Sequence, residues 1–172
     1  MQKILKVECY SHEEFDTLCE TNGWNDSDKP DDIAFISICC TPNCAKYWLE
    51  EEDEHWFKQS EGNVLNLNFD DISCDEREWN GFVFYGMSMG QAEETVEFIQ
   101  RMIDQGIRRF WIHCRAGQSR SQGVVRYISD CYKDQFEIKT RSDNPCLTPN
   151  IDVVAKLKRI WRFSTIDSLN KK

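Results

Sequence analysis

The sequence predicts an α/β domain of three layers, in which helices flank a central, mostly parallel sheet. Short apolar runs rich in β-branched residues alternate with longer segments whose apolar residues recur at helical spacing. One short loop that contains glycine joins an apolar run to a helical segment, and open α/β sheets place ligands at such strand ends. A length of 172 residues suits one domain with a sizeable core, so we expect residues 1–172 to form a single domain.

The chain begins with a predicted strand and a predicted helix. Ile4 to Val7 alternates apolar and polar residues, which is typical of a strand. Ser11 and Glu14 match a capping box, which predicts a helix that runs to about Asn22.

Two further strands are expected before residue 70. Ile33 to Cys40 is apolar and β-branched, and Pro42 ends this run. Ala45 to Gln59 is rich in Trp, Glu and Asp and is expected to be helical, with the acidic run at 50–54 on a solvated surface. The apolar residues from Val64 to Phe69 predict the next strand.

A long loop and an amphipathic helix follow. Ser73 to Met87 contains three consecutive charged residues and then Trp-Asn-Gly, and we interpret it as a loop, since long loops tend to be functional. Ser88 and Gln91 form a second capping-box pattern. Apolar residues at helical spacing from Ala92 to Ile103 predict the helix itself.

The last third of the chain completes the alternation. Arg109 to Ile112 is a predicted strand, and the segment from Gln122 to Lys133 is a predicted helix. Phe136 to Leu147 is expected to be a polar loop. Thr148 is expected to cap the last helix, with Pro149 at its first position.

The most informative stretch is the strand–loop–helix junction that begins at His113. Amide groups of a loop near a helix N-terminus form an anion site, and such a site favours the thiolate form of a cysteine such as Cys114. A thiolate within an oxyanion-binding loop is suited to attack on phosphorus. Arg120 follows six positions later, and its planar guanidinium can hold two phosphoryl oxygens at once.

This pattern resembles the cysteine-dependent protein tyrosine phosphatases, most closely the compact dual-specificity type. The shared residues are His113-Cys114-Arg115-x-Gly117-x-Ser119-Arg120-Ser121. The resemblance implies the same α/β fold, with a phosphatase-like phosphate-binding loop at the carboxyl end of a strand. It also implies a metal-independent hydrolase with no cofactor, which acts on phosphomonoesters through a phosphocysteine intermediate.

The resemblance assigns a role to each residue of the motif. Cys114 is the expected nucleophile, and Arg120 stabilises charge in the transition state. Ser121 is expected to ease departure of the Cys114 sulfur, and His113 to order the loop and support the thiolate. The expected phosphate-binding residues are Arg115, Ala116, Gly117, Gln118, Ser119 and Arg120.

A general acid must protonate the leaving group, and Asp71 is the preferred candidate. The segment Phe69-x-Asp71-Ile72 resembles a set of small bacterial-type predicted tyrosine phosphatases, in which a strand ends in an aspartate that lies over the active cysteine. Asp70 and Asp75 remain alternatives.

The sequence leaves the identity of the substrate open. Trp79 or Phe82 is a candidate pocket wall for an aromatic substrate, and phosphotyrosine is expected first, with phosphoserine and phosphothreonine as further substrates. One alternative is a phosphatase for a non-protein substrate, such as an RNA 5′-phosphate end or a phosphoinositide. Another alternative is a non-catalytic module that only recognises phosphate, although the intact Cys114, Arg120 and Ser121 argue against it.

Charge and composition limit the partners. Residues 1–80 contain 6 basic and 20 acidic residues, whereas residues 81–172 contain 15 and 10, so the half with the anion loop is basic. The net charge of −9 argues against binding long nucleic acids, and we expect a phosphorylated protein or another phosphomonoester as the partner. We find no transmembrane or signal segment and expect a cytoplasmic protein that does not bind membranes. The oligomeric state is not determined by the sequence.

The nine cysteines are expected to be reduced. Their number is odd and their spacing irregular, which does not suit a secreted disulfide framework. Cys39, Cys40 and Cys44 cluster upstream of His55, but a second pair of ligands is missing, so we expect no metal.

Overall fold

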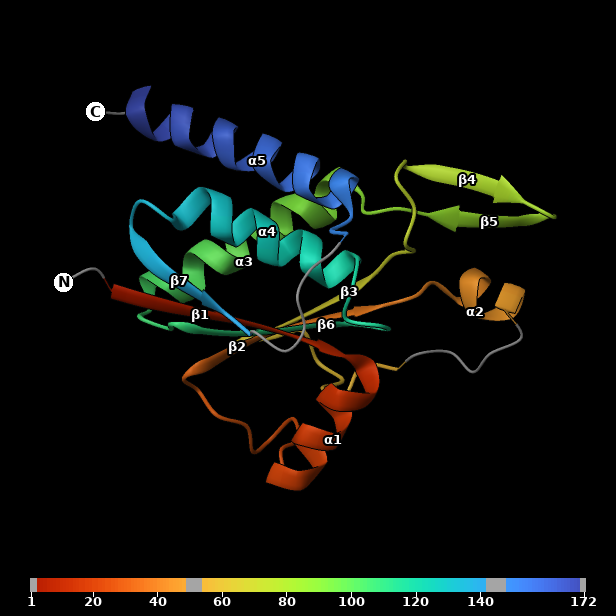
Figure 1. Ribbon diagram of the computed structural model, residues 1–172, viewed down its shortest axis with the longest axis horizontal. Helices are drawn as coiled ribbons and strands as arrows, with labels where there is room; N and C mark the ends of the chain where they lie inside the picture. The colour runs from red at the N-terminus through yellow and green to blue at the C-terminus, as the bar shows by residue number, and fades with distance from the viewer. Residues whose placement is uncertain (1–2, 49–53, 142–147, 171–172) are drawn as a thin grey trace.

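The computed structural model describes residues 3–48, 54–141 and 148–170, and their side chains through residue 164. Its centre is a five-stranded parallel sheet with the strand order β3-β2-β6-β1-β7 (Figure 1). These strands are β1 (Lys3–Ser11), β2 (Ile33–Cys39), β3 (Val64–Asn68), β6 (Arg109–Cys114) and β7 (Phe136–Thr140). The predicted α/β class with a central parallel sheet is therefore confirmed.

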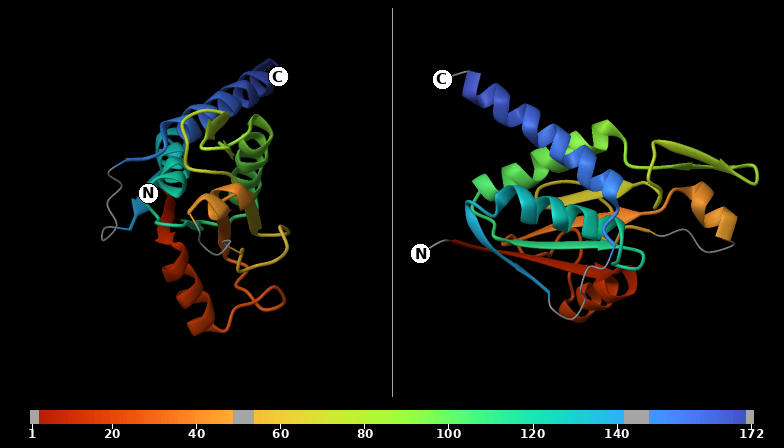
Figure 2. Two further views of the ribbon diagram at one scale, coloured as in Figure 1. Left: turned by 90° about the vertical axis from the view of Figure 1, so that its right-hand side faces the viewer. Right: turned by 45° about the horizontal axis from the view of Figure 1, so that its top comes forward.

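Helices cover both faces of the sheet, which makes the three layers. Figure 2 shows α3, α4 and α5 together on one face and α1 on the other. The helices are α1 (His12–Asn22), α2 (Pro42–Trp48), α3 (Met89–Asp104), α4 (Arg120–Tyr132) and α5 (Ile151–Asn170). Each helix in the part of the chain that the structure describes is too short or too polar to cross a membrane.

The alternation of side chains along the strands divides the core into two parts. On β6, Phe110 and Ile112 join the larger core with Cys114, beneath α3, α4 and α5. Trp111 lies on the opposite face, in the smaller aromatic core that α1 covers together with Phe15. Because successive strand residues point to opposite faces, the phase of β6 places Cys114 on the face from which α4 continues.

The remaining elements gather at the carboxyl end of the sheet. Helix α2 and a two-stranded antiparallel hairpin, β4 (Glu76–Trp79) and β5 (Phe82–Tyr85), lie at the same side of the molecule (Figure 1). Residues from α2 contact β5, where Tyr47 packs edge-on against Phe82 and Phe84. This end is where parallel sheets present their ligand sites.

Several sequence predictions are confirmed. The capping boxes at Ser11 with Glu14 and at Ser88 with Gln91 are both formed, with each side chain bonded to the partner's backbone N–H. Local hydrogen bonds of this kind depend on spacing alone, which is why the sequence predicts them correctly. The expected strand at Ile4–Val7 is present as well, although β1 is longer, at Lys3–Ser11.

The helix expected over Ala45–Gln59 is wrong in extent. In the described residues α2 spans Pro42–Trp48, and residues 54–59 are not helical. Residues 50–53 of the predicted acidic surface lie outside the described residues. The reason is tertiary: Phe57 is buried in the smaller core, and the indole N–H of Trp56 donates to the Trp24 carbonyl at 2.9 Å.

Two segments predicted as loops contain strands. The segment Ser73–Met87 holds the β4–β5 hairpin, whose turn residues Asn80 and Gly81 have φ of 50° and 78°. An Asn-Gly pair is the usual signal for such a turn, so the sequence did carry this information. The first residues of the expected polar loop at Phe136–Leu147 form the edge strand β7, and residues 142–147 lie outside the described residues.

Candidate active site

The predicted anion loop lies where the sequence places it. Cys114 is the last residue of β6, residues 115–119 form the loop, and α4 begins at Arg120. The loop opens into a cavity of about 630 Å³, which we call the Cys114 cavity. Its lining residues are Cys40, Cys44, Trp48, Asp71, Cys114, Arg115, Ala116, Gln118, Ser119, Arg120 and Thr148.

Five of the six expected phosphate-binding residues line this cavity directly, and the sixth, Gly117, packs against the backbone of β1 instead. Gly117 has a φ of 67° and approaches β1 so closely that a Cβ atom would lie 2.7 Å from the Tyr10 carbonyl. Only glycine avoids this clash, because the contact is with backbone that cannot move aside. The loop is further tied to α4 by the Gln122 side chain, which donates to the Gly117 carbonyl at 3.1 Å.

Cys114 and Ser121 are in contact as predicted. The Cys114 Sγ lies 3.0 Å from the Ser121 Oγ, and both residues are buried. The Cys9 thiol, from the neighbouring strand β1, donates to the same Ser121 Oγ at 3.0 Å. With its oxygen accepting from Cys9, the Ser121 hydroxyl can direct its own hydrogen at the Cys114 sulfur, which would stabilise a thiolate.

Arg120 is held rigidly beside Cys114. Its Nη1 donates to the Phe69 carbonyl at 2.7 Å, and its Nη2 lies 3.3 Å from the Cys40 Sγ. Burial alone would lower the pKa of Arg120, but the neighbouring sulfurs of Cys40 and Cys114 raise it, so the guanidinium stays charged. A guanidinium has five N–H donors, so these two contacts orient the group and leave donors for a phosphoryl group.

Asp71 is the aspartate that lines the Cys114 cavity. Its Oδ1 accepts hydrogen bonds from the Ser119 hydroxyl at 2.7 Å and from the Asn150 amide at 2.8 Å. The carboxylate is therefore fixed to the anion loop itself, although it comes from a different part of the chain. This position suits a group that transfers a proton at the mouth of the cavity.

The two rival aspartates have other partners. Asp70 is buried and accepts three hydrogen bonds, from the Thr41 N–H and hydroxyl and from the Tyr85 N–H, at 2.7–2.9 Å. It thereby joins the start of α2 to the β4–β5 hairpin. Asp75 is exposed and pairs with Lys156 at 2.6 Å, and this ion pair lowers the pKa of Asp75. Neither arrangement offers a proton to the Cys114 cavity.

His113 lies on the opposite face of β6 from Cys114. Its ring stacks on Phe15 with the centroids 4.2 Å apart, and among the described residues neither ring nitrogen has a hydrogen-bond partner. Burial, followed by the nearby His12 and His55, lowers its pKa well below the ordinary value. The ring is thus neutral at pH 7, so it cannot support the thiolate as a full positive charge, and its expected role in ordering the loop stays a prediction.

The buried neutral ring of His113 predicts how stability depends on pH. The unfolded chain binds a proton on this residue below a pKa of about 6.5, whereas the folded protein does not. The free energy of unfolding should therefore fall as the pH drops below about 6.5, by up to about 1.4 kcal/mol per pH unit from this group. His113→Phe should remove that dependence, which urea unfolding at pH 7, 6 and 5 would measure; equal pH slopes in the two proteins would contradict it.

A second cavity adjoins the first beside the hairpin. This hairpin cavity, of about 490 Å³, is lined by Cys44, Tyr47, Trp48, Asp70, Asp71, Ile72, Arg77, Trp79 and Phe84. Cys44, Trp48 and Asp71 line both cavities, so the two are neighbours. Of the two aromatic residues predicted as a pocket wall, Trp79 lines this cavity, and Phe82 packs against Tyr47.

One group of side chains could hold a metal ion. The Sγ atoms of Cys40 and Cys44 and a carboxylate oxygen of Asp70 lie within 4.8 Å of one another. However, both Asp70 oxygens already accept hydrogen bonds, and burial, aided by the neighbouring Cys40, raises the pKa of Cys44 to about 12. Metal ligation requires deprotonated thiols, so a metal here would have to displace the thiol protons and compete with the donors that Asp70 already has.

The structure also brings to the site residues that the sequence analysis missed. Asn150, rather than Thr148, caps α5: its Oδ1 accepts from the N–H groups of Asp152 and Val153, and the helix begins at Ile151. Asparagine directly before an apolar helical stripe is an N-cap signal that could have been recognised. The contacts of Cys9 and Cys40 with the site had no such signal, because they join residues more than 70 positions apart.

Comparisons with known proteins find similarity only among solved structures, since neither a protein-family model nor a curated protein matches the sequence. The human tyrosine phosphatase-like serine/threonine/tyrosine-interacting protein is 16% identical, with 87% of this chain and 83% of that chain covered and a TM-score of 0.40. Tk-PTP in its active form is 14% identical (92% and 80% covered, TM-score 0.40). PTPMT1 in complex with PI(5)P is 12% identical (92% and 94% covered, TM-score 0.43). The function must follow from the residues of the site rather than from such distant similarity.

Proposed function

We propose that this protein is a metal-independent phosphatase that hydrolyses phosphomonoesters through a phosphocysteine intermediate, with phosphotyrosine as the preferred substrate. The observation that carries the proposal is the shared cavity. Cys114, Arg120 and Asp71 all line it, and Ser121 lies 3.0 Å behind the nucleophilic sulfur. A nucleophile, a cation for the phosphoryl oxygens and a proton donor are the groups that the reaction needs.

The first step forms the intermediate. The Cys114 thiolate attacks phosphorus, so that an S–P bond forms as the bond from phosphorus to the leaving oxygen breaks. Asp71 gives its proton to that oxygen, and the product leaves as a neutral alcohol or phenol. Arg120 and the loop N–H groups stabilise the charge on the remaining phosphoryl oxygens.

The second step releases phosphate. Asp71, now a carboxylate, takes a proton from water while the water oxygen attacks phosphorus. The S–P bond breaks, and the sulfur departs as a thiolate that the Ser121 hydroxyl stabilises across 3.0 Å. Both residues return to their starting state without a metal or a cofactor.

The preference for an aromatic leaving group rests on the hairpin cavity. A leaving oxygen protonated by Asp71 lies where the two cavities meet, because Asp71 lines both of them. The group attached to this oxygen then faces the rings of Trp48 and Trp79, which are 62% and 51% exposed. Exposed aromatic side chains at the edge of a catalytic cavity favour a planar apolar group, as in phosphotyrosine.

Turnover measurements with a chelator present test the proposal. Matched phosphotyrosine, phosphoserine and phosphothreonine peptides should be compared with phosphoinositides and triphosphate-ended RNA. We expect hydrolysis without metal, inhibition by vanadate, and the highest kcat/KM for phosphotyrosine. Absence of turnover on every substrate would refute the phosphatase, and a higher kcat/KM for RNA or lipid would refute the substrate.

The preference for phosphotyrosine can be tested with a variant in the same experiment. Trp79→Ala should raise KM for the phosphotyrosine peptide about 3-fold to 10-fold, the value of one aromatic contact, and should change the serine peptide less. Phe163→Ala is the matched control, because Phe163 is a similarly exposed aromatic residue (57%) on α5 and lines neither cavity.

A further inference from the structure

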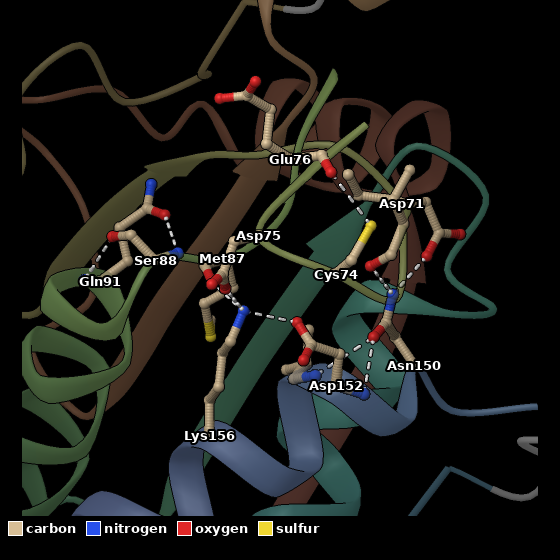
Figure 3. A network of polar contacts seen from close by, with 12 residues as sticks. Asp71, Cys74, Asp75, Glu76, Met87, Ser88, Gln91, Asn150, Asp152 and Lys156 are labelled. Atoms are coloured by element: carbon tan, nitrogen blue, oxygen red, sulfur yellow. Dashed lines mark hydrogen bonds and ion pairs between the residues drawn. The ribbon is translucent and has the colours of Figure 1, made fainter. Parts of the chain in front are cut away.

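The segment that carries Asp71, residues 71–75, is fixed by one buried amide, and we call it the acid segment. Asn150 is only 6% exposed, and its Nδ2 donates to the Asp71 Oδ1 at 2.8 Å and to the Ile72 carbonyl at 3.2 Å. Figure 3 shows the Asn150 side chain reaching from the start of α5 to the acid segment. Both N–H donors of the amide are thus directed at the residues that place the general acid.

Asn150 also joins the acid segment to the anion loop. Its backbone N–H donates to the Ser119 carbonyl at 3.1 Å, and Ser119 in turn donates its hydroxyl to the Asp71 Oδ1. Asp71, Ser119 and Asn150 therefore form a closed set of contacts between three segments that are distant in sequence.

Lys156, six residues further along the chain in α5, holds the same region from the other side. Its Nζ donates to Asp75, to Asp152 and to the Met87 carbonyl at 2.6–2.7 Å (Figure 3). Asp75 precedes the hairpin and Met87 follows it, so both ends of the hairpin are tied to α5. The first two turns of α5 and its N-cap consequently support the whole acid segment.

Helix capping by itself does not require asparagine at this position. The cap uses only the Oδ1 atom, which accepts from Asp152 and Val153, and serine, threonine or aspartate caps a helix about as well. The NH₂ group takes no part in the cap. Its two hydrogen bonds go to the acid segment instead, so the amide has a second role.

We propose that Asn150 is a positioning residue for the general acid Asp71, a role that rests on the proposed phosphatase function. Because the Asn150 and Ser119 hydrogen bonds both go to the Oδ1 atom, the transferable proton resides on Oδ2. Asn150 thus fixes which oxygen carries the proton and where it lies over the Cys114 cavity. Without the amide, the carboxyl group can rotate, and proton transfer loses its geometry.

The test variant is Asn150→Ser, which keeps a helix cap but is too short to reach Asp71. We expect kcat/KM for phenyl phosphate, whose leaving group needs a proton, to fall about 10-fold to 100-fold, a part of the full effect of a general acid. The value for 2,4-dinitrophenyl phosphate, which leaves without a proton, should change less than about 3-fold. The vanadate inhibition constant and the melting temperature should stay close to those of the original protein.

Asn43→Ser is the matched control. The Asn43 amide also donates to a hairpin carbonyl, that of Val83 at 3.1 Å, but it lines neither cavity. This variant should show no dependence on the leaving group. An equal loss on both substrates in Asn150→Ser would assign Asn150 to the anion loop and overturn the proposal.

The double variant separates this proposal from the proposed function. In an Asp71→Asn background, Asn150→Ser should add little further loss, because the two changes remove the same proton transfer. If Asp71→Asn shows the leaving-group effect and Asn150→Ser does not, only the Asn150 proposal fails. If Asp71→Asn shows no such effect, the acid assignment fails, and the role of Asn150 fails with it.

Discussion

Replacing Cys114 with serine is expected to abolish turnover while substrate binding is retained. A serine hydroxyl remains protonated at neutral pH and is a far weaker nucleophile than a thiolate, so we expect kcat to fall by at least about 10⁴-fold. Arg120 and the anion loop are unchanged, so the variant should still bind a phosphotyrosine peptide. Steady-state turnover and equilibrium binding of the same peptide would measure the two effects separately.

Cys131→Ser serves as the control for Cys114→Ser. Cys131 lies in α4 and does not line the Cys114 cavity, and burial raises the pKa of Cys131 to about 11. Cys131→Ser should therefore retain nearly full activity. Full activity in Cys114→Ser, or a strict need for an added divalent metal, would contradict the mechanism.

Asp71→Asn is expected to have the second largest effect, and the effect should depend on the leaving group. An asparagine cannot donate a proton in this way, so kcat/KM for phenyl or alkyl phosphates should fall about 10²-fold to 10⁴-fold. A dinitrophenyl substrate should lose much less, because its leaving group departs unprotonated. A plot of log kcat/KM against leaving-group pKa would show the change as a steeper negative slope.

Asp75→Asn and Asp70→Asn are two further controls, and different results are expected from them. Asp75→Asn should leave the slope unchanged, since Asp75 is exposed and Lys156 keeps its contacts with Asp152 and the Met87 carbonyl. Asp70→Asn should lower the free energy of unfolding, because the buried carboxylate accepts three hydrogen bonds that an amide cannot accept in full. A leaving-group effect in Asp75→Asn but not in Asp71→Asn would show that the acid has been assigned wrongly.

Much of the site could be predicted because it is local in sequence. Cys114, the loop and Arg120 occupy seven consecutive positions, so a strand that ends and a helix that begins there bring them together without further information. The two capping boxes are equally local. Because strand residues alternate between faces, Cys114 lies on the same face of β6 as Phe110 and Ile112.

The sequence alone could not distinguish the roles of Asp70 and Asp71. Asp70 and Asp71 are adjacent and chemically identical, yet one is buried against Thr41 and Tyr85 and the other lines the Cys114 cavity. Only a resemblance of sequence pattern favoured Asp71. The structure distinguishes them by which side chain points into the protein, and this depends on partners about 15 to 80 residues away.

The sequence by itself determined the alternation of strands and helices, the position of the anion loop and the choice of Cys114 as the candidate nucleophile, because these depend on periodicity and short spacing. Only the tertiary structure decided which residues complete the site. The sulfur of Cys40 beside Arg120, the thiol of Cys9 beside Ser121 and the amide of Asn150 on Asp71 all join distant segments. Distances between such segments arise from packing of the whole chain, and no local pattern of residues encodes them.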